Sequence, residues 1–137
     1  MQLLLILAVA VGSWIYVPGG TWQPTAIEVA DAKTKLRPYV LAQSKRRNDK
    51  ISPWNAYTFQ YQGREIDGRK IIYVNASCSE PPEYAAQEMV FVLDGGTCYF
   101  QAYYDIQTRA FVGIGFNGLA GMPPNNSFKP NPLRGLA

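Results

Sequence analysis

Residues 57–78 read YTFQYQGREIDGRKIIYVNASC, and this segment predicts a β-hairpin. Tyr57, Phe59 and Tyr61 alternate with polar residues, which is the period-two pattern of a strand with one buried face. Asp67-Gly68 is typical of a two-residue hairpin turn. A turn centred there makes one face of the hairpin apolar and the other polar. The predicted pairs are Tyr57 with Cys78, Phe59 with Ala76, Tyr61 with Val74, Gln60 with Asn75 and Gln62 with Tyr73.

The segment before this hairpin predicts a helix that covers the apolar face. The residues Thr25-Ala-Ile-Glu28 form a capping box, in which side chains satisfy the exposed backbone donors of a helix start. An apolar stripe at helical spacing follows, with Val29, Leu36 and Val40. Pro38 interrupts it, because proline lacks the backbone donor that the helix needs. We therefore expect a helix that is kinked or split at Pro38.

A second hairpin is predicted further along the chain. Residues 88–93 and 97–104 flank Gly95-Gly96, which permits positive φ angles at a turn, and a third turn near 106–108 leads into a strand at 110–116. Between the hairpins, residues 79–87 predict a short helical turn opened by proline. The expected register places Phe91 opposite Phe100, Leu93 opposite Cys98, Glu88 opposite Tyr103, Ile114 opposite Phe100, Val112 opposite Ala102, Gly115 opposite Tyr99 and Gly113 opposite Gln101.

These elements predict an α+β fold, with an N-terminal helix packed on a four- to five-stranded antiparallel sheet. The order of one helix followed by strands is similar in outline to cystatin-like folds. That similarity is one of shape and carries no function.

The two ends lie outside the predicted domain, which covers residues 14–121. Leu3 to Val11 is an uncharged apolar run followed by Gly12-Ser13, so residues 1–13 are interpreted as a signal peptide and the protein as exported, periplasmic or extracellular. A retained short anchor, which would bring the protein to a membrane, and a buried strand are the alternatives. Residues 122–137 are rich in proline and asparagine and predict a disordered tail.

The tail also carries a resemblance. Residues 126–135 read NSFKPNPLRG, which resembles the translated recombination site at the end of integron gene cassettes. The body, notably residues 57–63 and 94–101, resembles small uncharacterised exported bacterial proteins. The resemblance implies a mobile accessory cargo gene, and it implies no activity.

Composition excludes several classes of function. The chain has no histidine, which removes Ser-His and Cys-His nucleophile pairs and most transition-metal sites. The net charge is only +3, and the cluster Lys45-Arg46-Arg47 is interpreted as a solvated helix end, so no nucleic-acid partner is expected. Glu88 lacks the second carboxylate that a glycosidase requires. We expect no enzyme activity, no cofactor and no metal.

Cys78 and Cys98 leave two readings open. In an exported protein two cysteines favour a disulfide. In a simple meander, however, these residues lie at opposite edges, about 15–20 Å apart, whereas a bridge needs Cα atoms within roughly 7 Å. Either residues 79–87 cross over and bring the two together, or the thiols are free and buried. A catalytic cysteine is disfavoured because no histidine is present to activate it.

The leading functional hypothesis is a non-catalytic binding module that uses the polar face of the sheet. Amides beside phenol rings suit a neutral polar ligand, either a glycan or a peptide backbone. Gly113 and Gly115 would leave a shallow trough among them. The alternative is that these are ordinary strand-surface residues. The candidate ligand-binding residues are Gln60, Gln62, Tyr73, Asn75, Tyr99, Gln101 and Tyr103.

A second hypothesis comes from Gln60-Tyr-Gln-Gly63, which resembles the Gln-x-Val-x-Gly loop of cystatins as it enters the first hairpin. This resemblance implies a protein inhibitor of a cysteine protease, although Gln62 stands in place of the valine. The partner is a polar ligand or another protein, and a homodimer through the outer strands is left open.

Overall fold

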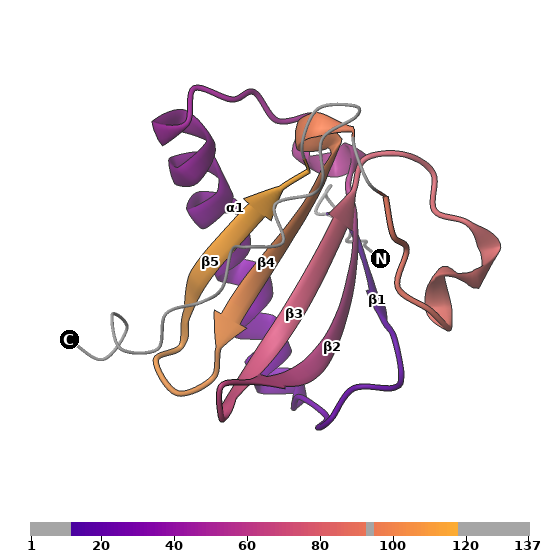
Figure 1. The fold of residues 1–137 in the computed structure, drawn as a ribbon, viewed down its shortest axis with the longest axis vertical. Helices are drawn as coiled ribbons and strands as arrows, with labels where there is room; N and C mark the ends of the chain where they lie inside the picture. Colours follow the sequence, from indigo (N-terminus) through magenta and orange to yellow (C-terminus); the bar gives the residue numbers. More distant parts are fainter. Residues whose placement is uncertain (1–11, 93–94, 118–137) are drawn as a thin grey trace, which may run out of the picture.

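The computed structural model describes residues 12–92 and 95–117 and shows one helix packed against a five-stranded sheet (Figure 1). The strand order is β1-β2-β3-β4-β5, antiparallel except for the parallel pair β1–β2. Most of the predicted leader, Leu93 and the whole predicted tail lie outside the described residues. The helix and strands are β1 (Ser13–Tyr16), α1 (Ala26–Arg46), β2 (Thr58–Ile66), β3 (Arg69–Ser77), β4 (Tyr99–Asp105) and β5 (Ala110–Phe116), and the 3-10 turns are η1 (Trp54–Ala56), η2 (Glu83–Ala86) and η3 (Gly96–Cys98).

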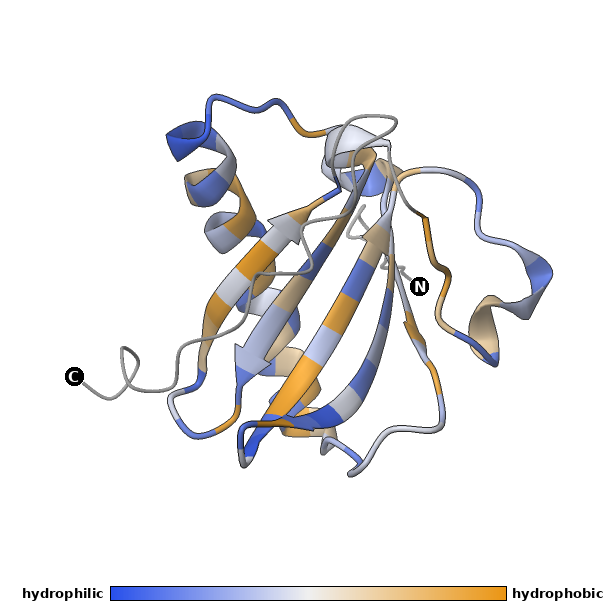
Figure 2. Cartoon of the chain, viewed as in Figure 1, coloured by the Kyte–Doolittle hydropathy of each residue, from blue (hydrophilic) through white to orange (hydrophobic). Residues whose placement is uncertain are grey.

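The β2–β3 hairpin has the predicted register. Asp67 and Gly68 have φ angles of 52° and 79°, as a two-residue turn with positive φ at both central positions requires. Hydrophobic and hydrophilic residues alternate along β3 (Figure 2). The observed pairs include Phe59 with Ala76, Tyr61 with Val74, Gln60 with Asn75 and Gln62 with Tyr73.

Helix α1 begins at the predicted capping box. The Glu28 backbone N–H donates to Thr25 Oγ1 at 3.2 Å, and the Thr25 N–H donates to Glu28 Oε1 at 2.9 Å. Of the two expectations at Pro38, the split is wrong, because α1 is a single helix of 21 residues, and the kink stays a prediction. Proline removes only one intrahelical donor, and Leu36 and Val40, on either side of Pro38, are both fully buried in the same core.

The core lies between α1 and one face of the sheet. Phe59, Val74, Phe100 and Ile114 are at most 4% exposed and join the helix residues in one apolar cluster. The predicted orientation of the apolar face is therefore confirmed.

Strand β1 corrects the prediction that the sheet is wholly antiparallel. Its apolar residues continue the run that was interpreted as a leader, and a buried strand was one of the alternatives. Trp14 pairs with Phe59 in the parallel ladder, and the two rings stack with centroids 4.8 Å apart. The crossover through α1 allows this parallel pairing, which a short turn does not.

The predicted hairpin at Gly95-Gly96 is wrong. Residues 88–92 form no strand, Phe91 is 72% exposed rather than stacked on Phe100, and Glu88 does not pair with Tyr103. β4 pairs with β3 on one edge and with β5 on the other, so no edge of β4 is left for residues 88–92. A short apolar run such as residues 89–93 is consistent with a buried strand but does not specify a partner for it. The predicted helical turn within residues 79–87 is confirmed as η2.

Strand β5 has the predicted bounds, but its register differs by two residues. Phe100 lies opposite Phe116 and Ala102 opposite Ile114, and the ladder is irregular between Tyr103 and Tyr104. Because side chains alternate with a period of two, a shift of two residues keeps Ile114 on the core side.

Candidate functional site

The polar face of the sheet is joined to a long connection between β3 and β4. We call residues 79–92 the strap. It leaves the end of β3, loops out on the β1 side of the sheet and returns towards β4 (Figure 1). It contains η2, and its only fully buried apolar residue is Ala85. Apolar packing alone therefore does not hold the strap.

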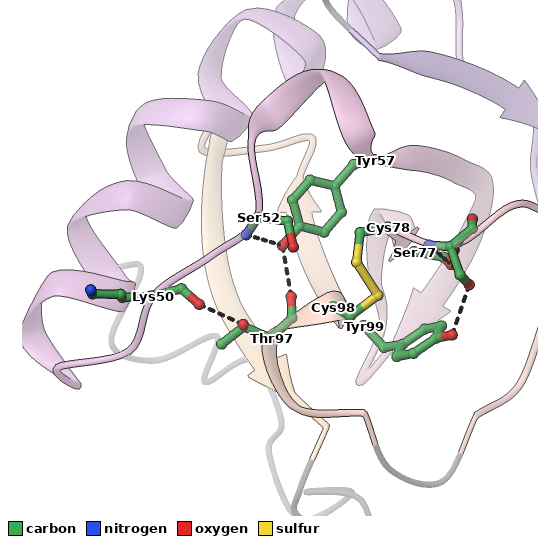
Figure 3. Close-up of a disulfide and its surroundings, with 9 residues drawn as sticks. Lys50, Ser52, Tyr57, Ser77, Cys78, Thr97, Cys98 and Tyr99 are labelled. Atoms are coloured by element: carbon green, nitrogen blue, oxygen red, sulfur yellow. Dashed lines mark hydrogen bonds between the residues drawn. A yellow bond between two sulfur atoms is a disulfide. The ribbon is translucent and has the colours of Figure 1, made fainter.

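A disulfide between Cys78 and Cys98 joins the two ends of this connection (Figure 3). The Cα atoms are 5.0 Å apart, and the Cys78 N–H donates to the Cys98 carbonyl at 2.8 Å. Of the two readings that the sequence left open, the structure selects the disulfide formed by a crossing connection, and the distance expected for a simple meander does not apply. Because β4 lies beside β3, the end of one strand and the start of the next are neighbours, and the connection crosses over.

Hydrogen bonds surround the disulfide and fix the end of the connection (Figure 3). The buried Tyr57 hydroxyl donates to the Thr97 carbonyl at 2.7 Å and accepts from the Ser52 N–H at 3.1 Å. On the other side, the hydroxyls of Ser79 and Tyr99 are 2.7 Å apart. The connection is thus anchored at both ends.

Gln60 holds the middle of the strap through its side-chain amide. The Nε2 group donates to the carbonyls of Ala85 and Glu88, at 2.7 and 2.8 Å. The Oε1 atom accepts from the Val90 N–H at 2.8 Å and from Asn75 Nδ2 at 3.0 Å. Gln60 is 3% exposed, so every hydrogen-bonding position of a buried amide is used by the chain itself.

Three further amides extend this pattern across the sheet. Asn75 Nδ2 donates to the Val90 carbonyl at 2.7 Å, and Asn117 Nδ2 donates to the Val92 carbonyl at 2.6 Å. Gln101 Nε2 lies between them and donates to both Asn75 Oδ1 and Asn117 Oδ1 at 3.2 Å. We call Gln60, Asn75, Gln101 and Asn117 the amide row. Gln60, Asn75 and Asn117 bind backbone groups of the strap, and Gln101 joins Asn75 to Asn117.

The other end of the polar face carries a stack of charged and aromatic groups. Gln62 is buried, donates to the carbonyls of residues 17–18 and accepts from Arg64 Nε at 2.8 Å. The Arg64 guanidinium lies 3.8 Å from the centre of the Tyr73 ring, which is 5.5 Å from the Tyr103 ring. Burial, reinforced by the neighbouring Tyr103, raises the pKa of Tyr73 to about 12, although Arg64 opposes the shift. Burial also raises the pKa of Tyr103.

The register places all seven candidate ligand-binding residues on this one face. The chain itself buries three of them, Gln60, Gln62 and Asn75, while the other four, Tyr73, Tyr99, Gln101 and Tyr103, are half-buried. The face is therefore not the open trough that the sequence suggested. Gly113 and Gly115 lie opposite Tyr103 and Gln101, and both are buried.

The strap carries the most exposed large apolar side chains of this region. Phe91 is 72% exposed and Tyr84 is 47% exposed, and both are among the largest apolar side chains on the described surface. The carboxylates of Glu83 and Glu88 are exposed beside them in sequence. Sequence reasoning missed this surface because it assigned Phe91 to the core.

Sequence reasoning also missed Asn117 and Arg64. Asn117 follows β5 directly, and an amide at the end of a strand beside a row of other amides is the signal that would have indicated its role.

The segment Gln60–Gly63, which resembles the inhibitory loop of cystatins, lies inside β2, between β1 and β3, and not at a loop. A Cβ atom on Gly63 would lie 2.2 Å from the Trp22 carbonyl, so close backbone packing accounts for this glycine.

Within residues 12–92 and 95–117, no three potential metal-ligating side chains lie together. In the same part of the chain, no helix has the length and apolarity needed to cross a bilayer. Comparisons with protein-family models, curated proteins and solved structures find no match to this chain, so the role of the strap is argued from its geometry.

Proposed function

We propose that the protein is an exported, non-catalytic binding module that recognises a peptide segment of another protein through its strap. One observation carries the proposal. The strap is hydrogen-bonded to buried amides of the sheet and lies between two disulfide-bonded cysteines. Its Phe91 and Tyr84 side chains are nevertheless 72% and 47% exposed. Exposing large apolar side chains costs free energy unless a partner covers them.

The fixed strap favours binding because little conformational entropy remains to be lost. Gln60 and Asn75 bind the backbone of Val90 and Asn117 binds that of Val92, so the backbone on both sides of Phe91 is held before a partner arrives. Aromatic side chains on such a surface are the usual centres of binding energy in protein interfaces. Glu83 and Glu88 favour a partner with an apolar pocket and a basic rim.

A peptide partner fits this region better than a glycan. The amide row, which was the expected site for a sugar, is already bonded to the strap, and Tyr73 and Tyr103 are half-buried against each other. The disulfide supports an oxidising compartment, which agrees with the export expected from the apolar leader.

The test is selection of ligands by the immobilised full chain from a random peptide library, with a glycan array in parallel. We expect peptides to be enriched and to lose at least about tenfold in affinity when Phe91→Ala is introduced. Leu41→Ala is the matched control, because Leu41 is 44% exposed on α1, away from the strap. Enrichment of glycans alone, or equal losses in both variants, would reject the proposal.

A further inference from the structure

A second candidate binding site lies on the helix side of the sheet, away from the strap. A cavity of about 470 Å³ opens where α1 passes β1 and η1. This volume is within the roughly 300–1,000 Å³ of typical small-molecule sites. Its lining includes Trp14, Trp54, Lys33, Thr34, Arg37 and Pro38.

Two indole rings form the apolar part of the lining, and the core holds both of them. Trp14 stacks on Phe59 with ring centroids 4.8 Å apart and an interplanar angle of 28°. The Trp54 ring packs on the same Phe59 ring, with the two ring centroids 5.0 Å apart. Phe59 is fully buried, so both indoles pack against the close-packed core.

The polar part of the lining is cationic. Lys33 Nζ lies 5.6 Å from the centre of the Trp14 ring, and Arg37 follows one helical turn later. Neither side chain forms an ion pair with a described residue, whereas Lys35 on the same helix is 2.9 Å from Asp31. The described lining residues include no carboxylate. Two cations are thus left beside an aromatic cavity without an anion.

We infer that this cavity binds a small organic anion with a flat apolar body, such as an aromatic carboxylate. The indoles would stack on the body of the ligand, and Lys33 and Arg37 would pair with its anionic group. The volume accommodates one or two fused rings. The site is separate from the strap, so its ligand and the peptide partner proposed above can be tested independently.

The first experiment compares two probes of equal shape on the full chain by isothermal titration calorimetry. 2-Naphthoate carries the carboxylate, and 2-naphthamide replaces it with a neutral group. We expect naphthoate to bind at least about tenfold more tightly than naphthamide and to lose affinity as sodium chloride is added. Undetectable naphthoate binding at millimolar concentration, or equal affinity for both probes, overturns the inference.

The second experiment locates the site by matched charge removal. The double variant Lys33→Gln/Arg37→Gln should bind naphthoate at least about tenfold more weakly. Lys45→Gln/Arg46→Gln removes the same charge from the last turn of α1 and should change the affinity less than about twofold. All four side chains are exposed, so circular dichroism should show an unchanged fold. Equal loss in the two double variants would show a general charge effect and reject the site.

Discussion

The two faces of the sheet are covered by different kinds of interaction. On one face, α1 packs through apolar side chains such as Leu36 and Val40 against Phe59 and Phe100. On the other face, the strap is held by directional hydrogen bonds from the amide row to its backbone. Apolar packing is non-directional and spread over many contacts, whereas each amide bond requires one particular partner. One face therefore supplies global stability, and the other supplies a defined loop conformation.

This difference predicts how the two faces respond to change. The strap buries little apolar surface, so it can open without unfolding the sheet, and local opening costs less than global unfolding. Loss of a core side chain, in contrast, should destabilise every element at once. Substitutions on the helix side should therefore cost more stability than substitutions on the strap side.

The largest effect should come from the helix side. Phe59→Ala removes a fully buried ring that contacts Trp14, Trp54 and Phe100. We expect a loss of about 3–5 kcal/mol in the free energy of unfolding, from lost transfer energy and the cavity left behind. Urea denaturation measures it, with the exposed Leu41→Ala as control. A loss below about 1 kcal/mol would contradict the packed core described above.

Removal of the disulfide should have the next largest effect. The bridge joins residues 20 positions apart, and closing a loop of this size contributes roughly 3 kcal/mol through the entropy of the unfolded chain. Cys78→Ser/Cys98→Ser should therefore lower the urea midpoint without changing the fold of β2 and β3. If hydrogen exchange showed the β2–β3 hairpin unprotected in this variant, the two faces would not be independent.

A change in the amide row should be smaller and local. Gln60→Met keeps the side-chain length but leaves the carbonyls of Ala85 and Glu88 without their donor. We expect a loss of about 1–3 kcal/mol, the cost of unsatisfied buried polar groups. The Val90 amide should exchange faster with solvent, while amides in α1 keep their protection. Gln107→Met, at an exposed position, is the matched control.

The smallest effect should appear only at high pH. The folded state raises the pKa of Tyr73 from 10.0 to about 12, so it keeps a proton that the unfolded chain releases near pH 10. The stability contributed by this phenol is complete below pH 10 and is lost as the pH rises towards 12. The slope should be at most about 1.4 kcal/mol per pH unit. In Tyr73→Phe the slope should be shallower, and absorbance at 295 nm should show one late-titrating phenol fewer.

Local patterns predicted the parts of the fold in which neighbours in sequence are neighbours in space. The turn at Asp67-Gly68 sets the register of β2 and β3, because a two-residue turn leaves only one way to pair the strands. The capping box at Thr25 likewise marks the start of α1 within the same few residues. Each of these features is complete within a short segment.

The features that were predicted wrongly depend on segments that are far apart in the sequence. Residues 89–93 read MVFVL, an apolar run that is consistent with a buried strand, but which segment pairs with β4 depends on parts of the chain that are far apart in sequence. Trp14 continues the apolar run of the predicted leader, and only the crossover through α1 shows that it pairs with Phe59. The candidate site was affected in the same way. Its residues share a face as predicted, but no local pattern indicates that the strap covers Gln60 and Asn75.

Sequence patterns alone were enough to predict a helix on a sheet, the apolar face of the first hairpin and the grouping of amides and phenols on the other face. They were enough because side-chain periodicity and turn chemistry act over a few residues. The tertiary structure alone decided that β4 pairs with β3, that Cys78 meets Cys98, and that the amide row binds the strap and leaves Phe91 exposed. These outcomes depend on which distant segments compete for the same strand edge, and that competition is settled only when the whole chain packs.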